Sequence, residues 1–295
     1  MKCRGESPPV VAKSMMKRSE TIGRWLFLWM LAASSAVAEV SGELETGAEL
    51  SPFYFRAGAY LLNSSTLARV DGRGGVLGSR LDFEDDLGLD RRKETLLTGF
   101  RWRFRDRHFL EFEYFNLKRF GQKRIETEIS FRDQFYPIGA DLNSSFTTEV
   151  TRASYGYRIV RREDWGLALT GGVHVTRLYA RLDGLTFDNI DLPVRSREVA
   201  SVTAPLPVLG LSGARRLGGK WILVARGQMF FLEVDDVKGA VTHMAAFVEH
   251  STFRNVGFGF GYDWFNIDVD TTDTNWYGSV DVQFRGPMVF IQASF

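Results

Sequence analysis

The chain has 295 residues, of which 44% are hydrophobic, 14% are aromatic and 25% are charged. This aromatic content excludes a chain that is disordered along most of its length. The mean hydropathy of -0.14 and the lack of any apolar run of about 18 residues argue against a helical membrane protein.

Residues 1–38 have the features of a cleaved secretory signal peptide. Basic residues precede an apolar run from Trp25 to Ala33, and small residues then lead to a cleavage site at Ala36-Val37-Ala38. Cleavage would remove the only cysteine, Cys3, so neither disulfides nor thiol chemistry is expected afterwards. Export and the slightly acidic remaining chain disfavour a nucleic-acid partner, so none is expected. Residues 39–50 are expected to form a short N-terminal lead.

Residues 51–295 are expected to form one all-β domain, because alternation of apolar and polar residues dominates this part of the chain. In the segment 99–105, for example, Phe100, Trp102 and Phe104 alternate with Arg101 and Arg103. The pattern predicts strands at residues 52–63, 94–105, 109–120, 146–160, 164–180, 204–216, 220–234, 238–249, 254–269 and 276–295.

The second and third predicted strands are expected to form a hairpin around a turn at residues 106–108. The predicted register pairs Phe104 with Leu110, Arg103 with Glu111, and Arg101 with Glu113. It would place opposite charges together on one face of the hairpin and aromatic residues on the other.

Strand length and loop length together favour a membrane barrel over a soluble sandwich. Several predicted strands are longer than the 3–10 residues that are usual in soluble sheets. Long connections at about 64–93, 121–145 and 181–203 alternate with short ones, as in barrels with short periplasmic turns and long outer loops. We therefore predict an antiparallel transmembrane β-barrel of about 10 strands, with 8 or 12 as alternatives.

The last strand carries the resemblance to a known group of proteins. Val289, Ile291, Ala293 and Phe295 share one face, and Phe295 is terminal. Residues 50–295 thereby resemble the outer-membrane β-barrel superfamily of Gram-negative bacteria. The resemblance implies a location in the outer membrane, and Phe295 as an assembly signal for the barrel-assembly machinery. The segments 81–115 and 259–290 are also similar to small, functionally uncharacterised barrels of this kind, which implies no reaction.

The register of the last strand is expected to change along its length. Val280, Val282 and Phe284 are predicted to face lipid on even positions, whereas residues 289–295 face lipid on odd ones. A bulge at Gly286-Pro287 would reconcile the two halves, because proline cannot donate to the ladder.

The strand at 254–269 contains alternating glycines in the sequence VGFGFGYDWF. Tyr262 stands where a dinucleotide fingerprint needs its last glycine, so that interpretation fails. The aromatic row is instead expected to face lipid, and the row Gly257, Gly259 and Gly261 to face the lumen, which is the interior of the barrel. The missing side chains would leave room for Arg226 and Gln228 or let the wall bend.

Polar residues of the strands are expected to line the lumen. The principal set is Arg56, Arg101, Arg103, Glu111, Glu113, Arg152, Arg158, Arg226 and Asp263, and it is extended by Tyr54, Tyr60, His174, Gln228, Asp281 and Gln283. These charges could pair across the lumen and fill it, or leave a narrow pore that prefers anions. Small barrels are mostly filled by their side chains, which favours the first outcome.

The sequence gives only weak indications of a metal-binding or catalytic site. The acidic run from Leu81 to Asp90 fails as an EF-hand loop at Leu87 and Lys93, and it is expected to be a solvated loop that meets divalent cations near lipopolysaccharide. The four histidines lack metal-ligand spacing, so neither a metal nor a cofactor is expected. The neighbours His250 and Ser251 would point to opposite faces of a strand, which disfavours a hydrolase.

The sequence therefore predicts a structural or surface-interaction barrel rather than an enzyme. Its expected partners are outer-membrane lipid, lipopolysaccharide and the assembly machinery. A narrow channel for small polar or anionic solutes is one alternative, and a lipid A or phospholipid hydrolase is another.

Overall fold

The computed structural model describes residues 51–72, 77–187, 193–234, 237–273 and 276–295. The predicted signal peptide at 1–38 and the lead at 39–50 lie outside the described residues. Within the described ranges, no helix is long and apolar enough to cross a membrane.

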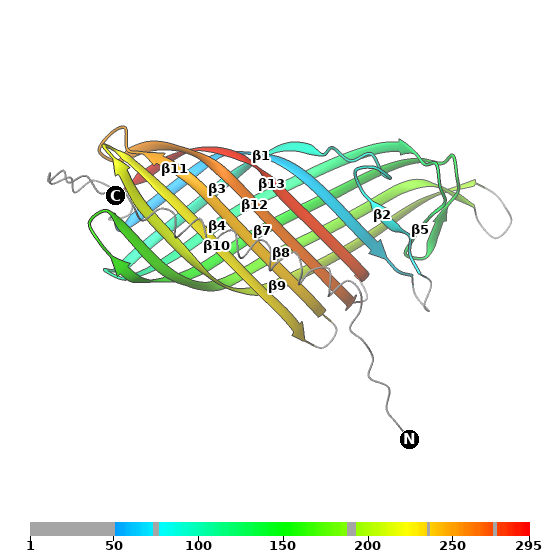
Figure 1. Ribbon diagram of the computed structural model, residues 1–295. Coiled ribbons are helices and arrows are strands. Elements are labelled where there is room, and N and C mark those ends of the chain that lie inside the picture. The colour runs from blue at the N-terminus through cyan, green and yellow to red at the C-terminus, as the bar shows by residue number, and fades with distance from the viewer. Residues whose placement is uncertain (1–50, 73–76, 188–192, 235–236, 274–275) are drawn as a thin grey trace, which may run out of the picture. The chain divides into compact units, whose positions relative to one another are not determined.

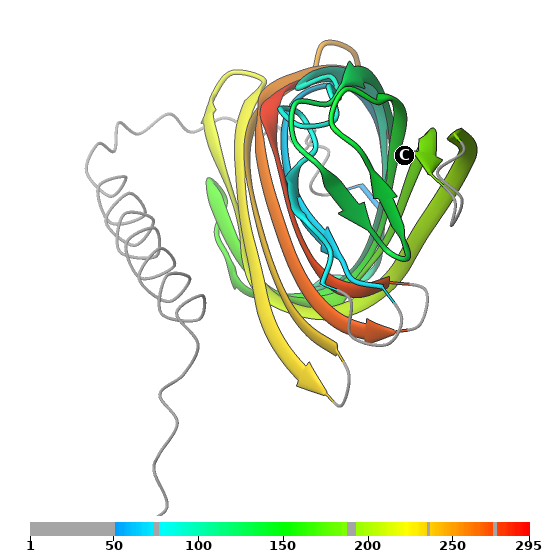
Figure 2. The ribbon, with the colours of Figure 1, turned by 90° about the vertical axis from the view of Figure 1, so that its right-hand side faces the viewer.

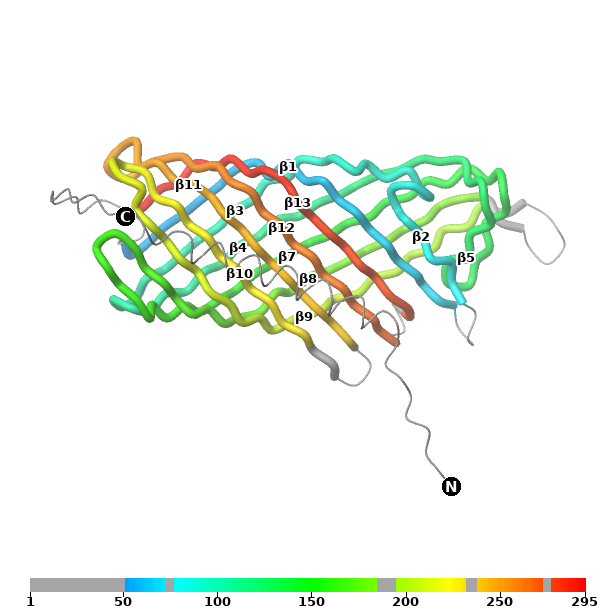
Figure 3. Tube along the Cα trace, viewed as in Figure 1, coloured from blue at the N-terminus to red at the C-terminus, as the bar shows by residue number. Residues whose placement is uncertain are grey.

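Ten long strands form one antiparallel sheet, which closes into a barrel because the last strand pairs with the first (Figure 1). The strands are β1 (Phe53–Val70), β3 (Arg92–Arg105), β4 (His108–Arg124), β7 (Asp141–Arg161), β8 (Trp165–Phe187), β9 (Pro193–Gly218), β10 (Trp221–Val234), β11 (Val237–His250), β12 (Val256–Asp273) and β13 (Trp276–Ser294). Each pairs with its neighbours along the chain and is tilted across the barrel wall (Figure 3). The predicted antiparallel barrel of about ten strands is confirmed.

The predicted boundaries are accurate at one end of the barrel and too short at the other. At the end with short turns, here called the turn end, each predicted boundary lies within a few residues of the observed one. At the opposite, loop end the strands run further: β8 continues to Phe187 and β9 begins at Pro193. Much of the predicted loops 64–93, 121–145 and 181–203 is therefore strand.

Three short strands lie at the loop end. Strand β2 (Arg80–Asp82) pairs with the end of β1, while β5 (Ile129–Phe131) and β6 (Gln134–Tyr136) pair with each other. Figure 2 shows the β5–β6 hairpin lying across the opening of the barrel. The loops thus contribute structure to the interior of the barrel.

The predicted register of the β3–β4 hairpin was wrong. Arg101 pairs with Glu111 and Trp102 with Leu110, two residues away from the predicted partners. The cause is an irregularity between Arg103 and Arg105, which shortens the turn so that Arg105 pairs with His108. Because the shift is even, each side chain keeps the face that was predicted for it.

The two faces of the barrel wall exchange their polarity partway up several strands, and β12 shows this directly. Its outward row is apolar from Val256 to Trp264 and then continues with Asn266 and Asp268. Its inward row consists of glycines and Asp263 up to that height, and then of the buried side chains of Phe265 and Ile267. We call this height the exchange level.

Other strands change at the same height. On β8 the outward row passes from Val175 to Arg177 while the inward row passes from Thr176 to Leu178. On β1 the outward row passes from Leu61 to Asn63. Below the exchange level the wall has the inverted polarity of a membrane barrel, with an apolar exterior. Above it the wall is built like a water-soluble sheet, with a polar exterior and an apolar core.

This exchange explains why the prediction for β13 was wrong. Val280, Val282 and Phe284 are fully buried and face inward, whereas Asp281 and Gln283, which were predicted to line the lumen, face outward. The pairing of β12 with β13 runs unbroken through the predicted bulge. The prediction assumed that apolar side chains face lipid along the whole strand, but these three lie above the exchange level.

The exposed wall above the exchange level contains a repulsive pair. Asp268 on β12 faces Asp281 on β13, and like charges directly opposite each other destabilise a sheet. We expect Asp268→Asn to raise the free energy of unfolding by about 0.2–1 kcal/mol at low salt, measured by urea denaturation. Asp270 faces Lys238 on β11, so Asp270→Asn is the matched control and should give no gain. A gain of equal size in both variants would contradict the assignment.

Candidate functional site

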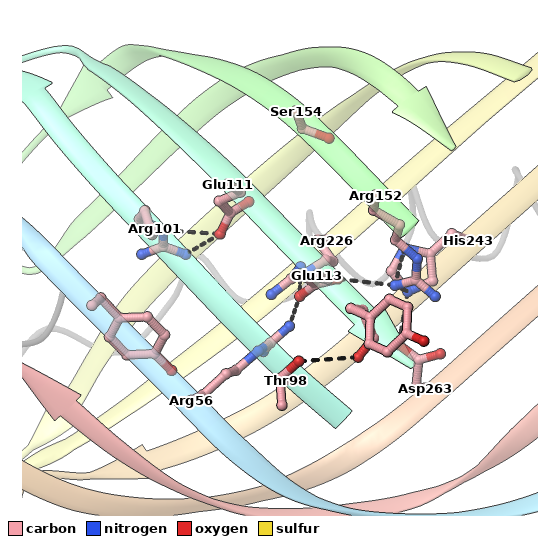
Figure 4. Close-up of polar contacts among 12 residues, drawn as sticks. Arg56, Thr98, Arg101, Glu111, Glu113, Arg152, Ser154, Arg226, His243 and Asp263 are labelled. Carbon is pink, nitrogen blue, oxygen red and sulfur yellow. Dashed lines mark hydrogen bonds and ion pairs between the residues drawn. The ribbon is translucent and has the colours of Figure 1, made fainter. Parts of the chain in front are cut away.

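The lumen below the exchange level holds a connected network of charged side chains centred on Glu113 of β4. Its Oε1 lies 2.7 Å from a guanidinium nitrogen of Arg226 and also contacts Arg56, and its Oε2 lies 3.0 Å from Arg152. Figure 4 shows this carboxylate among arginines that come from β1, β7 and β10. One buried carboxylate therefore links four strands across the lumen.

The network continues from Arg152 to a histidine and an aspartate. His243 Nε2 lies 3.0 Å from Arg152 and 2.7 Å from Asp263 Oδ2, while the hydroxyl of Tyr60 donates to Asp263 Oδ1 at 3.0 Å. A ring nitrogen can accept from the guanidinium or donate to the carboxylate, but it cannot do both at once. His243 Nδ1 also lies 3.4 Å from the Arg152 guanidinium, so the tautomer that donates from Nε2 to Asp263 leaves Nδ1 to accept from Arg152.

Aromatic rings fill the spaces between the arginines. The guanidinium of Arg56 lies 5.1 Å from the centre of the Phe247 ring and 5.6 Å from that of Phe290. The Phe290 ring also takes space that the glycines of β12 leave open, because a Cβ on Gly259 would meet that ring, whereas one on Gly261 would meet the backbone oxygen of Ala246 and the Cβ of Phe247. Phenylalanines, rather than the predicted Arg226 and Gln228, thus lie against Gly259 and Gly261.

The remaining predicted lumen residues lie apart from this centre. Arg101 binds Glu111 through two nitrogens, at 2.9 and 2.7 Å. Arg158 is buried with its guanidinium 6.0 Å from the centre of the Phe109 ring, and Arg103 is only half-buried at the turn end. The structure therefore separates the nine principal residues into the Glu113 network, the Arg101–Glu111 pair and two arginines nearer the turn end.

Two further polar pairs complete the lumen. The hydroxyl of Tyr54 donates to Glu249 Oε1 at 2.6 Å, and His174 Nε2 lies 2.9 Å from Gln228 Oε1. Glu249 is the last residue of the predicted strand 238–249, and it was missing from the predicted lumen set. Its position on the same alternating face as His243 and Phe247 would have identified it as an inward residue.

Above the exchange level the interior is an apolar core that includes residues from the loops. The segment 81–89, here called the plug segment, buries Leu81, Phe83, Leu87 and Leu89. The β5–β6 hairpin buries three further side chains, those of Ile129, Phe131 and Tyr136. Burial also raises the pKa of Tyr136 to about 12, so this phenol stays neutral at physiological pH. These segments occupy the loop end of the lumen.

A buried ion pair holds the plug segment to the barrel wall. Glu84 contacts the guanidinium of Arg119 on β4, which is fully buried, and its Oε2 accepts the backbone N–H of Thr66 on β1 at 2.8 Å. Arg119 in turn donates to the hydroxyl of Thr66 at 2.5 Å. The expectation of a solvated acidic loop was therefore wrong for Glu84.

The other carboxylates of the acidic run shape its turn. Asp82 Oδ1 accepts the backbone N–H groups of Glu84 and Asp85 at 3.0 and 2.9 Å, and Asp86 Oδ2 accepts that of Asp82 at 2.7 Å. Within the described residues, no group of three or more His, Cys, Asp or Glu side chains is placed to hold a metal ion. The run thus has a structural use that its composition did not reveal.

The residues around Ser251 point in different directions. Glu249 faces inward to Tyr54, whereas the ring of His250 lies 4.5 Å from that of Trp221, and its Nδ1 lies 3.1 Å from the hydroxyl of Thr252. The acid and the histidine of this short sequence thus have separate surroundings, and they do not form the linked arrangement that an activated serine requires.

A solved structure shares this architecture. The outer membrane protease OmpT from Escherichia coli matches with a TM-score of 0.50 at 10% sequence identity, over 88% of this chain and 100% of that one. The chain has the outer-membrane β-barrel fold. At this identity the likeness extends to the fold of the barrel and not to the activity of the protease.

Two other matches to the barrel have lower scores. The attachment invasion locus protein Ail of Yersinia pestis, solved with a heparin analogue, is 9% identical with a TM-score of 0.32, over 82% of this chain and 97% of that one. The translocator domain of the autotransporter NalP from Neisseria meningitidis is 11% identical with a TM-score of 0.35, over 96% of this chain and 98% of that one. No protein-family model and no curated protein sequence matches the chain.

Proposed function

We propose that the barrel is a non-conducting outer-membrane protein of the structural or surface-interaction type, with its loop end outside a Gram-negative cell. The observation that carries this proposal is the packing of the loop end by the plug segment and the β5–β6 hairpin. A conducting pore would need these buried apolar side chains to leave the lumen. The charged network centred on Glu113 fills the lumen below them.

The strands that continue past the exchange level support a role at the surface. Strands β7, β8 and β9 have 21, 23 and 26 residues, whereas about 9–11 tilted residues span the lipid. The excess forms a wall outside the membrane, and its outward face carries exposed charges such as those of Arg177 and Arg197. Such a wall offers a rigid surface to lipopolysaccharide or to another macromolecule.

Conductance tests the proposal directly. We expect the purified barrel to give no current steps above leak in planar bilayers, because side chains fill the lumen. Heat-modifiable migration on a detergent gel and flotation with liposomes would first establish that the barrel is folded and inserted. Regular steps from such a sample would refute the proposal and support the narrow channel, and Arg101→Ala should then change the anion preference.

Two expectations from the sequence remain part of this proposal. Lipid A from cells with and without the protein should have the same mass spectrum if the barrel does not modify lipid. The Phe295 side chain is exposed on the outward face, while its backbone N–H and C=O both pair with Phe53 at 3.0 Å. Presentation of this residue to the barrel-assembly machinery stays a prediction.

A further inference from the structure

The outer wall of β1, β3 and β13 carries positive charge at the exchange level. Asn63 on β1 faces Arg92 on β3 at one side and Arg285 on β13 at the other. Both arginines are exposed, and neither forms an ion pair within the part of the chain that the structure describes. Two uncompensated guanidinium groups therefore flank an amide at the height where the apolar exterior ends.

A groove lies at this place on the wall. It has a volume of about 630 Å³ and is lined by apolar residues that include Leu61, Tyr262 and Pro287, and by the charged side chains of Arg92, Lys93, Glu94 and Arg285. The apolar residues belong to the lipid-facing exterior, and the cations lie at its upper edge. Three cations and one carboxylate give the groove a net positive charge.

Pro287 accounts for the position of the groove. Proline has no backbone N–H to donate, and the pairing of β1 with β13 skips Leu61 and Leu62, which stand opposite Gly286 and Pro287. The pairing resumes at Asn63 and Arg285. The interruption in the pairing thus lies directly below the cationic row.

We propose that this groove binds the phosphate-bearing headgroup of an outer-leaflet lipid, of the lipid A type. The guanidinium groups of Arg92 and Arg285 would bind phosphate, which a planar guanidinium can contact through two parallel hydrogen bonds. The acyl chains would lie below, along Leu61 and Tyr262. The proposal rests on the orientation given under the proposed function, in which the loop end faces the outer leaflet.

The argument for a lipid, rather than a soluble anion, comes from the position of the cations. They stand immediately above an apolar surface that lipid tails already cover, so a phosphorylated lipid satisfies both parts of the groove at once. Lys93 lies 3.9 Å from Asp90, and this exposed pair is weak enough to release the ammonium group to a phosphate. The carboxylate of Glu94 would repel a ligand that brings more negative charge than the three cations can neutralise.

Binding of diphosphorylated lipid A to the refolded barrel in detergent micelles, measured by native mass spectrometry, tests the proposal. We expect Arg92→Ala/Arg285→Ala to weaken binding by about tenfold or more, because each lost contact is a charge-assisted hydrogen bond. The matched control is Arg105→Ala/Arg107→Ala, which removes two exposed arginines at the turn end, and it should bind as the native chain does. Heat-modifiable migration would show that each variant is folded.

Lipid A without its phosphates provides the second comparison. It should bind the native barrel about as weakly as the phosphorylated lipid binds the Arg92/Arg285 variant. Equal binding of the two lipids to the native barrel, or equal losses in the two double variants, would overturn the site. A barrel that gives no current but does not distinguish these lipids would remove this site alone, whereas a conducting barrel that distinguishes them would remove only the proposed function.

Discussion

Glu113→Gln is expected to lower the free energy of unfolding by about 3–5 kcal/mol, because it removes one partner from a buried charge network. Glu113 contacts Arg56, Arg152 and Arg226, so the amide would leave three guanidinium groups facing each other without their shared carboxylate. Glutamine has nearly the same shape as glutamate, so packing is preserved. The decrease in the free energy of unfolding therefore measures the effect of removing the charge. Urea unfolding of the refolded barrel in detergent, followed by tryptophan fluorescence, would measure it.

The control for this experiment is a carboxylate on the outer wall. Glu149 lies 3.7 Å from the exposed guanidinium of Arg177, and Glu149→Gln should cost less than about 1 kcal/mol. The difference between the two variants should persist at high salt, since buried pairs are screened much less than exposed ones. If Glu113→Gln lowers the free energy of unfolding no more than Glu149→Gln does, the network does not stabilise the barrel.

Glu84→Ala is expected to release the plug segment while the barrel wall stays folded. The change leaves the fully buried Arg119 without its carboxylate and frees the backbone N–H of Thr66, at a cost of about 3–5 kcal/mol. Because the segment contributes one part of the upper core, we expect local opening rather than global unfolding. Limited proteolysis should then cut within residues 81–91, and the cut sample should keep its heat-modifiable migration.

Asp85→Ala is the matched control for the release of the plug segment. This neighbouring carboxylate is exposed and pairs with Arg91 at 2.6 Å, so its loss should leave the segment resistant to proteolysis. If both variants resist cleavage equally, the Glu84–Arg119 pair is not what holds the segment. If both lose heat-modifiable migration, the segment is required for the barrel itself and not only for closing its lumen.

The strands were predictable from the sequence because lipid imposes a strict alternation on them. Phe100 and Trp102 face outward and Arg101 faces inward, and this pattern identifies a strand without any knowledge of its partners. The lumen residues below the exchange level followed from the same rule. Their pairing did not, because Glu113 meets Arg56, Arg152 and Arg226 only after the sheet has closed.

The part of the fold above the exchange level was less predictable, for a physical reason. There the apolar residues face inward, as Val280 and Phe284 do, so a rule that places apolar side chains toward lipid gives the opposite face. The role of Glu84 was hidden for a related reason. An acidic run is normally solvated, and only the position of Arg119 on a different strand makes burial of one of its carboxylates favourable.

At the exchange level the outward row turns from apolar to polar and the inward row from polar to apolar. Because the two changes occur at the same height, they fix how deeply the barrel lies in the membrane. A strand rises about 3.4 Å per residue and is tilted by about 45°, so a vertical shift of about 5 Å moves each wall by two residues. Sinking by that amount would carry Arg177 and Arg285 toward hydrocarbon, and rising would expose apolar exterior such as Leu61 to water. Because both displacements are opposed on β1, β8, β12 and β13, the chain itself determines the plane at which the membrane ends.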